Sequence, residues 1–297
     1  MIEARGTPAI AVVGSVNLDI VIGVERHPAP GETVLGGDRT DLAGGKGANQ
    51  AVAAARLGQE VAIVGRVGAD AAGGRLRDGL RAEGVDVGHL REDPDARSGV
   101  ALIAVAPDGE NTIIVSPGAN GRVGPGDVEA AAGLLGVAAV TLVQLEIPED
   151  AVRAAARAAG GTLVLNPAPA RELDADVLGR VDVLVPNSGE LELLAGPGDP
   201  ADAARRLAGP RAVVVTLGAD GVLVVEDDRA EHIGARSVDV VDTTGAGDAF
   251  CGALADALAR GATVVEAARW GVAAAALSVT RNGAQEGMPT AEMVRQL

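Results

Sequence analysis

Short apolar runs alternate with longer Ala-rich runs along most of this chain of 297 residues. The apolar runs 9–14, 61–67 and 162–166 have the length and the continuous hydrophobicity of buried strands. The Ala-rich runs 46–57 and 71–82 are typical of helices, and Gly58 and Gly84 follow them as helix stops. Strands that alternate with helices form a mostly parallel sheet that helices cover on both faces. We therefore predict an α/β fold around such a sheet.

The same alternation continues to the C-terminus. Further helices are predicted from residue 127 onward, from about residue 246 onward and over 148–159, 190–194, 201–207 and 264–279. Further strands are predicted over 138–145, 181–186, 211–216, 221–225 and 230–233. Two regions break the alternation. Residues 20–42 mix short runs with Pro and Gly, and Pro107-Asp108-Gly109 joins two strands at 100–106 and 111–116. We predict a single domain over 1–297, with small β-sheet lid strands inserted at about 18–42 and 98–117.

The composition restricts the core and excludes one class of partner. Hydrophobic residues make up 47% of the chain, yet the only Phe and Trp are Phe250 and Trp270 and there is no Tyr, so the core consists of Ala, Val, Leu and Ile. Two rings cannot form a base-stacking platform, and a net charge of −16 repels a phosphate backbone. We expect no nucleic-acid partner, and any nucleotide site needs local positive potential from helix ends, basic residues and cations.

Sequence features also bear on location and metal chemistry. Cys251 is the single cysteine, which excludes an internal disulfide, and the three His residues have no metal-ligand spacing. The segment 1–8 lacks the apolar region of a signal peptide, and no apolar stretch reaches about 18 residues, the length of a membrane span. We expect a soluble, cytoplasmic protein without a zinc site and without contact to a membrane.

The segment 241–250 carries the strongest chemical signal. Gly245 and Gly247 precede a long Ala- and Leu-rich run, and a helix that begins near Ala246 presents unpaired N–H groups to an anion. Asp248 lies in the first turn of that helix. A carboxylate beside an anion hole suits phosphoryl transfer to a hydroxyl group. The structural alternative is an ordinary helix start with Asp248 as a capping residue.

Further polar residues follow predicted strands at their carboxyl ends, where open α/β sheets bind ligands. Each cluster has an alternative explanation as a turn or a helix cap, but together they indicate a site at one sheet edge. Lys46 is the only lysine, within a Gly-rich helix start. The other residues in these clusters are Asn17, Asp19, Asn49, Glu146, Asn187 and the turn Thr216, Leu217, Gly218, Ala219, Asp220 and Gly221.

Two motifs of the chain resemble the signatures of the ribokinase family of carbohydrate kinases, the pfkB type. They are Gly44-Gly45-Lys46-Gly47-Ala48-Asn49-Gln50-Ala51 and Asp242-Thr243-Thr244-Gly245-Ala246-Gly247-Asp248. Shorter matches at 14–19, 30–33, 144–146 and 166–170 favour ribose over the other substrates of the family. The resemblance runs from about residue 10 to residue 289. It implies a ribokinase-like three-layer sandwich with a small β-sheet lid, and transfer of a phosphoryl group from ATP, with Mg²⁺ on its phosphates, to the 5-hydroxyl of D-ribose.

The resemblance also implies roles for individual residues. Asp248 is the expected base, and the anion hole comprises Gly245, Ala246 and Gly247. The expected sugar contacts are Asn17, Asp19, Gly45, Lys46, Gly47, Ala48, Asn49, Glu146 and Asp248. The expected nucleotide contacts are Asn187, residues 216–221, Gly247 and Gly271. A potassium ion beside the anion hole is expected at Asp242, Thr244, Ser278, Arg281, Gly283 and Gly287, in part through backbone carbonyls.

The chain departs from the family pattern at two points, and two alternative functions remain open. Gly271 offers no side-chain amide to adenine, and the lid has no aromatic ring for a nucleoside substrate. The first alternative is a sibling kinase that acts on deoxyribose, fructose or a nucleoside. The second is a catalytically silent sugar sensor on the same fold, against which Asp248 and its two neighbouring glycines argue. The resemblance further implies a homodimer formed through the lid strands.

Overall fold

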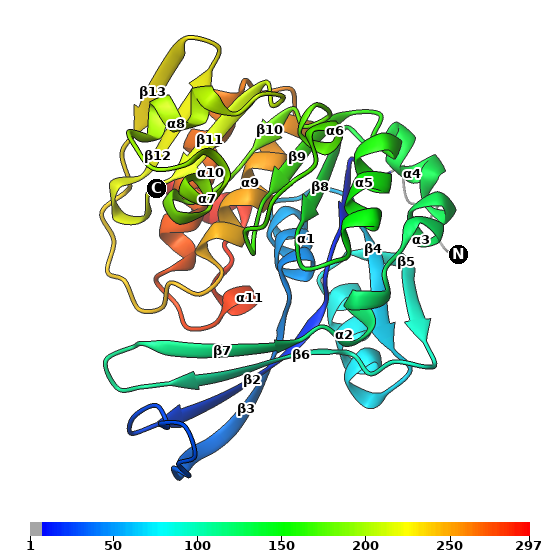
Figure 1. Ribbon diagram of the computed structural model, residues 1–297, viewed down its shortest axis with the longest axis vertical. Coiled ribbons are helices and arrows are strands. Elements are labelled where there is room, and N and C mark those ends of the chain that lie inside the picture. Colours follow the sequence, from blue (N-terminus) through cyan, green and yellow to red (C-terminus); the bar gives the residue numbers. More distant parts are fainter. Residues whose placement is uncertain (1–7) are drawn as a thin grey trace.

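A nine-stranded sheet forms the centre of the computed structural model, which describes residues 8–297 (Figure 1). The sequence predicts that no signal peptide is present at the N-terminus. Residues 1–7, on which that prediction rests, lie outside the described residues. The strand order is β13-β12-β11-β10-β9-β8-β1-β4-β5, parallel except for β12, which is antiparallel to both of its neighbours. The strands are β1 (Ile10–Val13), β4 (Val61–Gly68), β5 (Asp86–Asp93), β8 (Val140–Gln144), β9 (Thr162–Asn166), β10 (Val183–Leu184), β11 (Ala212–Thr216), β12 (Val222–Glu226) and β13 (Arg229–Ile233).

Helices cover both faces of this sheet, as the alternation in the sequence predicts. Along β1, Ile10 and Val12 face one helical layer while Ala11 and Val13 face the other, so every position of the strand is apolar and buried. The first layer contains α1 (Lys46–Arg56), α2 (Ala71–Ala82), α9 (Ala246–Ala259) and α10 (Val264–Ser278). The second contains α3 (Pro125–Ala130), α4 (Ala132–Val137), α5 (Glu149–Ala158), α6 (Ala175–Leu178), α7 (Ser188–Ala195) and α8 (Pro200–Arg206).

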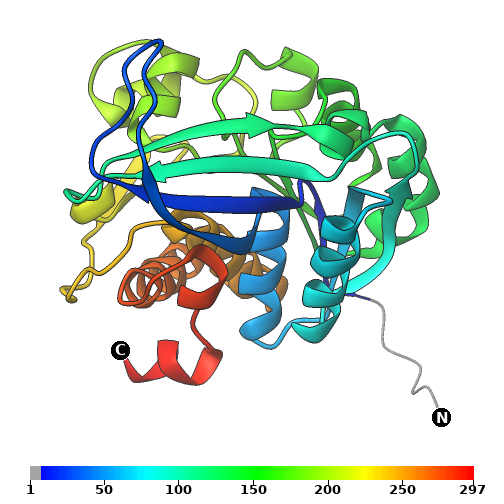
Figure 2. The same cartoon turned by 90° about the horizontal axis from the view of Figure 1, so that it is seen from below.

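A second, four-stranded sheet extends from the carboxyl end of β1 (Figure 2). Its order is β3-β2-β6-β7, with β2 (Asn17–Val24) parallel to β6 (Gly99–Val105) and antiparallel to β3 (Gly36–Gly44). β7 (Asn111–Ser116) forms the outer edge and is exposed at every residue. We call these four strands the small sheet. Its base packs on the core through Leu18 and Val100, so the rest of the sheet projects from the main body.

One strand of the main sheet was not predicted from the sequence. β5 lies at the edge of the sheet and pairs with β4 through an irregular register between Ala62 and Val64. Its buried residues Val87, Leu90 and Asp93 are therefore three positions apart rather than two. A strand with that spacing and an acidic residue among its buried positions gives no alternating apolar pattern.

Four short helical segments complete the secondary structure of the described residues. α11 (Ala284–Gly287) follows α10, and α12 (Ala291–Gln296) packs back on α10. The 3₁₀ segments are η1 (Gly118–Arg122) and η2 (Gly218–Asp220). Within residues 8–297, every helix is too short or too polar to cross a lipid bilayer.

Candidate active site

The carboxyl ends of the parallel strands meet at one edge of the main sheet, and a cavity of about 230 Å³ opens there. Asn166 at the end of β9, Asn187 after β10 and Thr216 at the end of β11 all line it. The start of α9 forms the opposite wall. The remaining lining residues are Lys46, Ala168, Val185, Glu190, Thr243, Gly245, Ala246, Gly247, Asp248 and Cys251.

The first turn of α9 faces this cavity because Gly245 adopts a backbone conformation that side chains disfavour. Its φ is 76°, and a Cβ there would lie 2.8 Å from the Cβ of Ala284. The positive φ turns the chain into the helix, whose first-turn N–H groups have no acceptor within the helix. The N–H of Ala246 donates to the carbonyl of Thr243, just before the helix, at 3.2 Å. Gly245, Ala246 and Gly247 line the cavity together, as expected for an anion-binding helix start.

Asp248 lies in this first turn with 7% of its surface exposed, and two amides hold its carboxylate. The Nδ2 of Asn49 donates to Oδ2 at 2.9 Å, and the Nε2 of Gln50 donates to Oδ1 at 3.0 Å. Both donors lie in the first turns of α1, which packs directly against α9. The carboxylate is therefore fixed in orientation while it remains on the cavity wall.

Two further amide side chains orient Asn49 and Gln50. Gln144 at the end of β8 donates to the Oε1 of Gln50 at 2.6 Å, and Gln285 in α11 donates to the Oδ1 of Asn49 at 3.0 Å. Gln50 and Gln144 are fully buried. Sequence reasoning did not select these glutamines as site residues. The sequence did offer a signal for them, because each is a polar residue within an apolar strand or an Ala-rich helix. A polar side chain that is buried in such an element usually has a hydrogen-bond partner.

Lys46 and Glu146 meet near the start of α1. The Oε2 of Glu146 accepts from the backbone N–H of Lys46 at 3.0 Å and from the hydroxyl of Ser15. Burial of the Lys46 ammonium favours its neutral form, but the carboxylates of Asp248, Glu146 and Glu190 outweigh that effect and raise the pKa of Lys46 above its ordinary value. The only lysine of the chain therefore stays charged at the cavity wall.

Asp19 has the most perturbed carboxyl group at this edge. It lies in β2 across from β3, and a Cβ on Gly44 would lie 2.0 Å from its carboxylate. Burial first, and then the negative charges of Glu146, Asp248 and Glu286, raise the pKa of Asp19 to about 7. A carboxyl group with that pKa, near other acidic groups, is typical of a functional site.

The other residues of the 44–51 motif bring α1 close to the β1–β2 turn. Gly45 has a φ of 88°, and a Cβ there would lie 2.7 Å from the backbone nitrogen of Asn17. A Cβ on Gly47 would lie 2.6 Å from the backbone nitrogen of Ser15. The methyl group of Ala48 packs in the core rather than at the cavity. These small residues therefore allow the close approach that places Asn17, Asp19 and Lys46 at one edge.

The predicted nucleotide residues occupy three different environments. Asn187 and Thr216 line the cavity, and Asn187 caps α7 in a reciprocal pair of hydrogen bonds with Glu190. The turn 217–221 follows β11, where the imidazole of His232 donates to the carbonyl of Asp220 at 2.7 Å. Gly271 is buried in α10, where a Cβ would lie 2.7 Å from the ring of Phe250, and it does not line the cavity.

Glu190 is a cavity residue that sequence reasoning did not include. Burial raises the pKa of Glu190 above its ordinary value, while the hydrogen bond from the Asn187 amide and the charge of Lys46 act in the opposite direction. It is the second carboxylate on the cavity wall beside Asp248. The sequence offered one signal for Glu190. It stands three residues after Asn187, and this is the spacing at which two side chains cap the start of a helix reciprocally.

The residues expected at a cation site lie in two adjacent loops next to Gly245. The carboxylate of Asp242 accepts from the N–H of Thr244 at 2.9 Å and from the N–H of Gly283 at 2.8 Å, which ties the two loops together. Burial raises the pKa of Asp242, but these hydrogen bonds outweigh it and keep the pKa below its ordinary value. A Cβ on Gly287 would lie 2.5 Å from the carbonyl oxygen of Ser278.

Arg281 is exposed in the second of these loops. Within residues 8–297, no group of three or more His, Cys, Asp or Glu side chains is arranged to hold a metal ion. A cation in these loops would therefore depend on carbonyl and hydroxyl oxygens, which are ligands suited to a hard cation.

Comparison with known proteins identifies similar sequences over nearly the whole chain. The family model described as pfkB family carbohydrate kinase matches residues 7–291. The ribokinase of Haemophilus influenzae is 39% identical over 291 residues, which cover 95% of each chain. The deoxyribokinase of Salmonella typhi is 37% identical over 298 residues, which cover 97% of each chain.

Solved structures show the same arrangement of elements. The ribokinase of Thermotoga maritima superposes with a TM-score of 0.92 at 36% identity, and the match covers 97% of this chain and 98% of that one. The ribokinase of Arabidopsis thaliana, solved in complex with ribose and ATP, gives a TM-score of 0.90 at 33% identity and covers 98% of both chains. The three-layer α/β fold with a small additional sheet is thereby confirmed.

Proposed function

This chain belongs to the pfkB family of carbohydrate kinases, and from that premise we propose that it phosphorylates the 5-hydroxyl of D-ribose with ATP. The observation that carries the proposal is the shared cavity of Asp248 and the first turn of α9. A proton acceptor and a set of anion-binding amides border one space large enough for reacting groups. The relative solved with ribose and ATP, at 33% identity over nearly the whole chain, supports the same substrates.

In the proposed reaction, Asp248 orients the 5-hydroxyl and accepts its proton as the oxygen attacks the γ-phosphorus. The new O–P bond forms as the bond between the γ-phosphorus and the β–γ bridging oxygen breaks, which releases ADP. The N–H groups at Gly245, Ala246 and Gly247 stabilise the charge on the transferred group. Asn49 and Gln50 hold the carboxylate in place throughout.

We assign the sugar subsite to the edge formed by β2 and the start of α1. Asp19 and Glu146 supply hydrogen-bond acceptors, and Asn17 and Asn49 supply side-chain amides. Lys46 contributes a positive charge, and Gly45 and Gly47 let α1 approach the β1–β2 turn, while Ala48 supports this wall from the core. The small sheet would act as a lid that closes over this subsite, because Asp19 lies within one of its strands.

We assign ATP to the wall formed by Asn187, the turn 216–221 and Gly247, with Gly271 in the helix behind it. Mg²⁺ would arrive on the phosphates of ATP, and Glu190 is the carboxylate besides Asp248 that could hold it at the cavity. When bound, the ion neutralises charge on the phosphate oxygens. We also propose a cytoplasmic location, because a kinase that uses ATP fits that compartment.

We further propose that a potassium ion binds between the loops 242–244 and 278–287. The donor set fits such an ion, because Asp242 joins the two loops and the Ser278 carbonyl comes within contact of Gly287. Oxygens of Asp242, Thr244, Ser278, Arg281, Gly283 and Gly287 would hold it, largely from the backbone. When bound, the ion adds positive potential next to the anion hole.

The chain also has the features of a homodimer that pairs through the small sheet. β7 is an edge strand, and Ile113, Ile114 and Val115 are exposed on it. An exposed apolar edge strand is a surface at which proteins associate. We propose that a second copy covers it.

Deoxyribose is the substrate of the named deoxyribokinase relative, which is almost as similar as the ribokinases. A sibling kinase for deoxyribose, fructose or a nucleoside is therefore the second candidate. The absence of aromatic rings from the sequence of the small sheet disfavours the nucleoside.

A coupled assay of ADP release tests the proposed function. The purified protein is assayed with ATP and Mg²⁺ against ribose, 2-deoxyribose, fructose and adenosine, in potassium and in sodium buffers. We expect the highest kcat/KM for ribose and a higher rate in potassium. Equal or faster turnover of another sugar would replace ribose as the substrate, and no turnover of any sugar would support the sensor alternative. Equal rates in both salts would remove the potassium proposal alone.

A further inference from the structure

Asn120 lies in η1, far in sequence from the sugar-binding edge, yet it contacts that edge directly. It is 1% exposed. Its Oδ1 accepts from the backbone N–H of Val16 at 2.9 Å, and its Nδ2 donates to the carbonyl of Val16 at 3.1 Å. The same Nδ2 donates to the Oδ1 of Asn17 at 2.7 Å. Both polar atoms of the Asn120 side chain are thus directed at two consecutive residues, Val16 and Asn17.

These contacts fix which way both side-chain amides point. A backbone N–H can only donate and a carbonyl can only accept, so the pairing with Val16 determines the orientation of the Asn120 amide. The Nδ2 of Asn120 must then face an acceptor on Asn17, which is its carbonyl oxygen. The NH₂ group of Asn17 is consequently left to face away from Asn120.

Gly99 makes this pairing possible. A Cβ at position 99 would lie 2.2 Å from the Nδ2 of Asn120 and 2.2 Å from the Oδ1 of Asn17. Residue 99 pairs with Asn17 in the ladder between β2 and β6. Any side chain there would separate the two amides.

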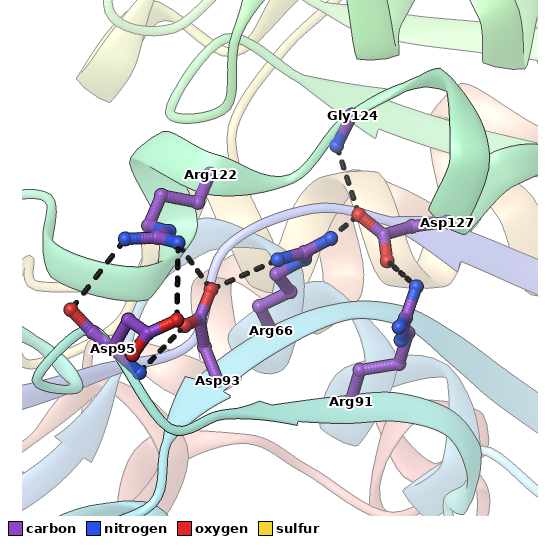
Figure 3. A network of polar contacts seen from close by, with 7 residues as sticks. All are labelled: Arg66, Arg91, Asp93, Asp95, Arg122, Gly124 and Asp127. Carbon is purple, nitrogen blue, oxygen red and sulfur yellow. Dashed lines mark hydrogen bonds and ion pairs between the residues drawn. The ribbon is translucent and has the colours of Figure 1, made fainter.

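A network of ion pairs around two buried carboxylates holds η1 against the main sheet (Figure 3). Arg122 of η1 pairs with Asp93 at 2.9 Å, and Arg66 pairs with Asp93 and Asp127, each at 2.8 Å. Arg91 completes the set with Asp127 at 2.9 Å. The side chains of Asp93 and Asp127 are almost fully buried, so the positions of these charges are well defined. These ion pairs therefore fix the position of η1, and with it the position of Asn120.

We propose that Asn120 is a positioning residue that makes Asn17 present an N–H donor, and not its carbonyl, to the sugar. This inference rests on the proposed function, in which Asn17 contacts ribose. Asp19, two residues along the same strand, supplies a hydrogen-bond acceptor when ionised. The pair would then offer one donor and one acceptor to the hydroxyl groups, which discriminates against sugars with a different hydroxyl pattern.

Asn120→Asp tests this assignment with almost no change of shape. The carboxylate places an oxygen opposite both the Oδ1 of Asn17 and the carbonyl of Val16. The backbone carbonyl is held by the chain, whereas the Asn17 side chain can rotate and turn its carbonyl toward the sugar. We expect KM for ribose to rise about tenfold, the effect of one lost hydrogen bond, while KM for ATP and kcat stay within about twofold. In the Asn17→Ala background, Asn120→Asp should change KM for ribose less than about twofold, because Asn120 acts through Asn17.

Gly99→Ala provides a second route if Asn120→Asp folds poorly. The added methyl group separates the same two atoms without a new charge, and its effect on KM for ribose should also disappear in the Asn17→Ala background. Gln59→Glu is the matched control, since residue 59 follows the C-terminal end of α1 and the new carboxylate would face that of Asp256 in α9. It should lower the melting temperature and leave KM for ribose unchanged.

The outcomes separate the inference from the function on which it rests. A wild-type protein that does not phosphorylate ribose overturns the proposed function and the assignment of Asn120 with it. An active wild type with an unchanged ribose KM in folded Asn120→Asp and Gly99→Ala overturns the assignment alone. Equal increases in the KM values for ribose and ATP, or an effect that persists without the Asn17 amide, would show a general structural role and also overturn it.

Discussion

Asp248 is a carboxylate whose two oxygens are already held before any substrate is bound. Asn49 and Gln50 each donate to a different oxygen, and Gln285 and Gln144 in turn orient these two donors. A preorganised acceptor of this kind lowers the cost of bringing the proposed base to its reactive geometry. The orientation of the Asp248 carboxylate therefore depends on these amide side chains.

Asp248→Asn should lower kcat by about 10²- to 10⁴-fold with only a modest change in KM for ribose, because it removes the proton acceptor and preserves the shape. Steady-state kinetics with varied ribose measure both constants. Asp199→Asn, which makes the same change at the N-cap of α8 outside the cavity lining, serves as the control. A variant with wild-type kcat would contradict the assignment of Asp248 as the base.

Asp19 predicts a pH dependence of sugar binding. Burial and the neighbouring carboxylates raise the pKa of Asp19 to about 7, so the acceptor form is lost as the pH falls through 7. We expect kcat/KM for ribose to fall about tenfold per pH unit below 7, since this ratio follows ionisation in the free enzyme. Asp19→Asn should have a lower kcat/KM without that inflection. The same inflection in the variant would assign the titration to another group.

At the scale of elements, the close contact of α1 with α9 decides where Asp248 lies. A Cβ on Gly252 would lie 2.4 Å from the Cβ of Ala53 and 2.8 Å from the carbonyl of Gln50. The helices can approach this closely only because residue 252 is glycine. Their separation places the amides of α1 within hydrogen-bond distance of the first turn of α9.

Gly252→Ala should therefore reduce both stability and catalysis. The methyl group forces the helices apart, and we expect a loss of about 1–3 kcal/mol in the free energy of unfolding, together with a lower kcat. Gly133→Ala in α4 is the matched control, because a Cβ there meets nothing within 4 Å, and it should be neutral or slightly stabilising. Chemical denaturation and steady-state kinetics measure the two effects. Wild-type stability in Gly252→Ala would refute the importance of this helix contact.

For the whole molecule, the small sheet connects the sugar subsite to the proposed dimer. Asn17 and Asp19 lie in β2, and β6 lies between β2 and the exposed edge strand β7. Contacts that a second copy makes with β7 could thus stabilise the sheet that carries the sugar ligands. The proposed association and the proposed lid function share one structural unit.

Ile114→Lys should convert the dimer to a monomer and raise KM for ribose. Ile114 is 64% exposed on β7, and a buried lysine at an interface is strongly unfavourable. Sedimentation velocity measures the oligomeric state at several protein concentrations. Val137 in α4 is equally exposed, so Val137→Lys should leave the oligomeric state and KM for ribose unchanged. A wild type that sediments as a monomer, or an Ile114→Lys variant that stays dimeric, would contradict the proposed interface.

The α/β alternation and the main polar clusters could be predicted from the sequence, because these features depend on local patterns. The helix predicted over 71–82 is α2, and the strand predicted over 162–166 is β9. Asp248 at the start of a helix also follows from local sequence, since glycines and a following Ala-rich run define that start. Family resemblance added the reaction and the roles of residues such as Asp242, which spacing alone could not supply.

The contacts between residues far apart in sequence became visible only in the folded chain. β5 escaped prediction because its register with β4 is irregular, and a pairing irregularity is invisible in one strand alone. Gln50, Asn120 and Gln144 look like isolated polar residues until the fold places each against its partner, between 94 and 198 positions away along the chain. Hydrogen bonding is a matter of distance and direction, and the chain sets both only when the elements pack.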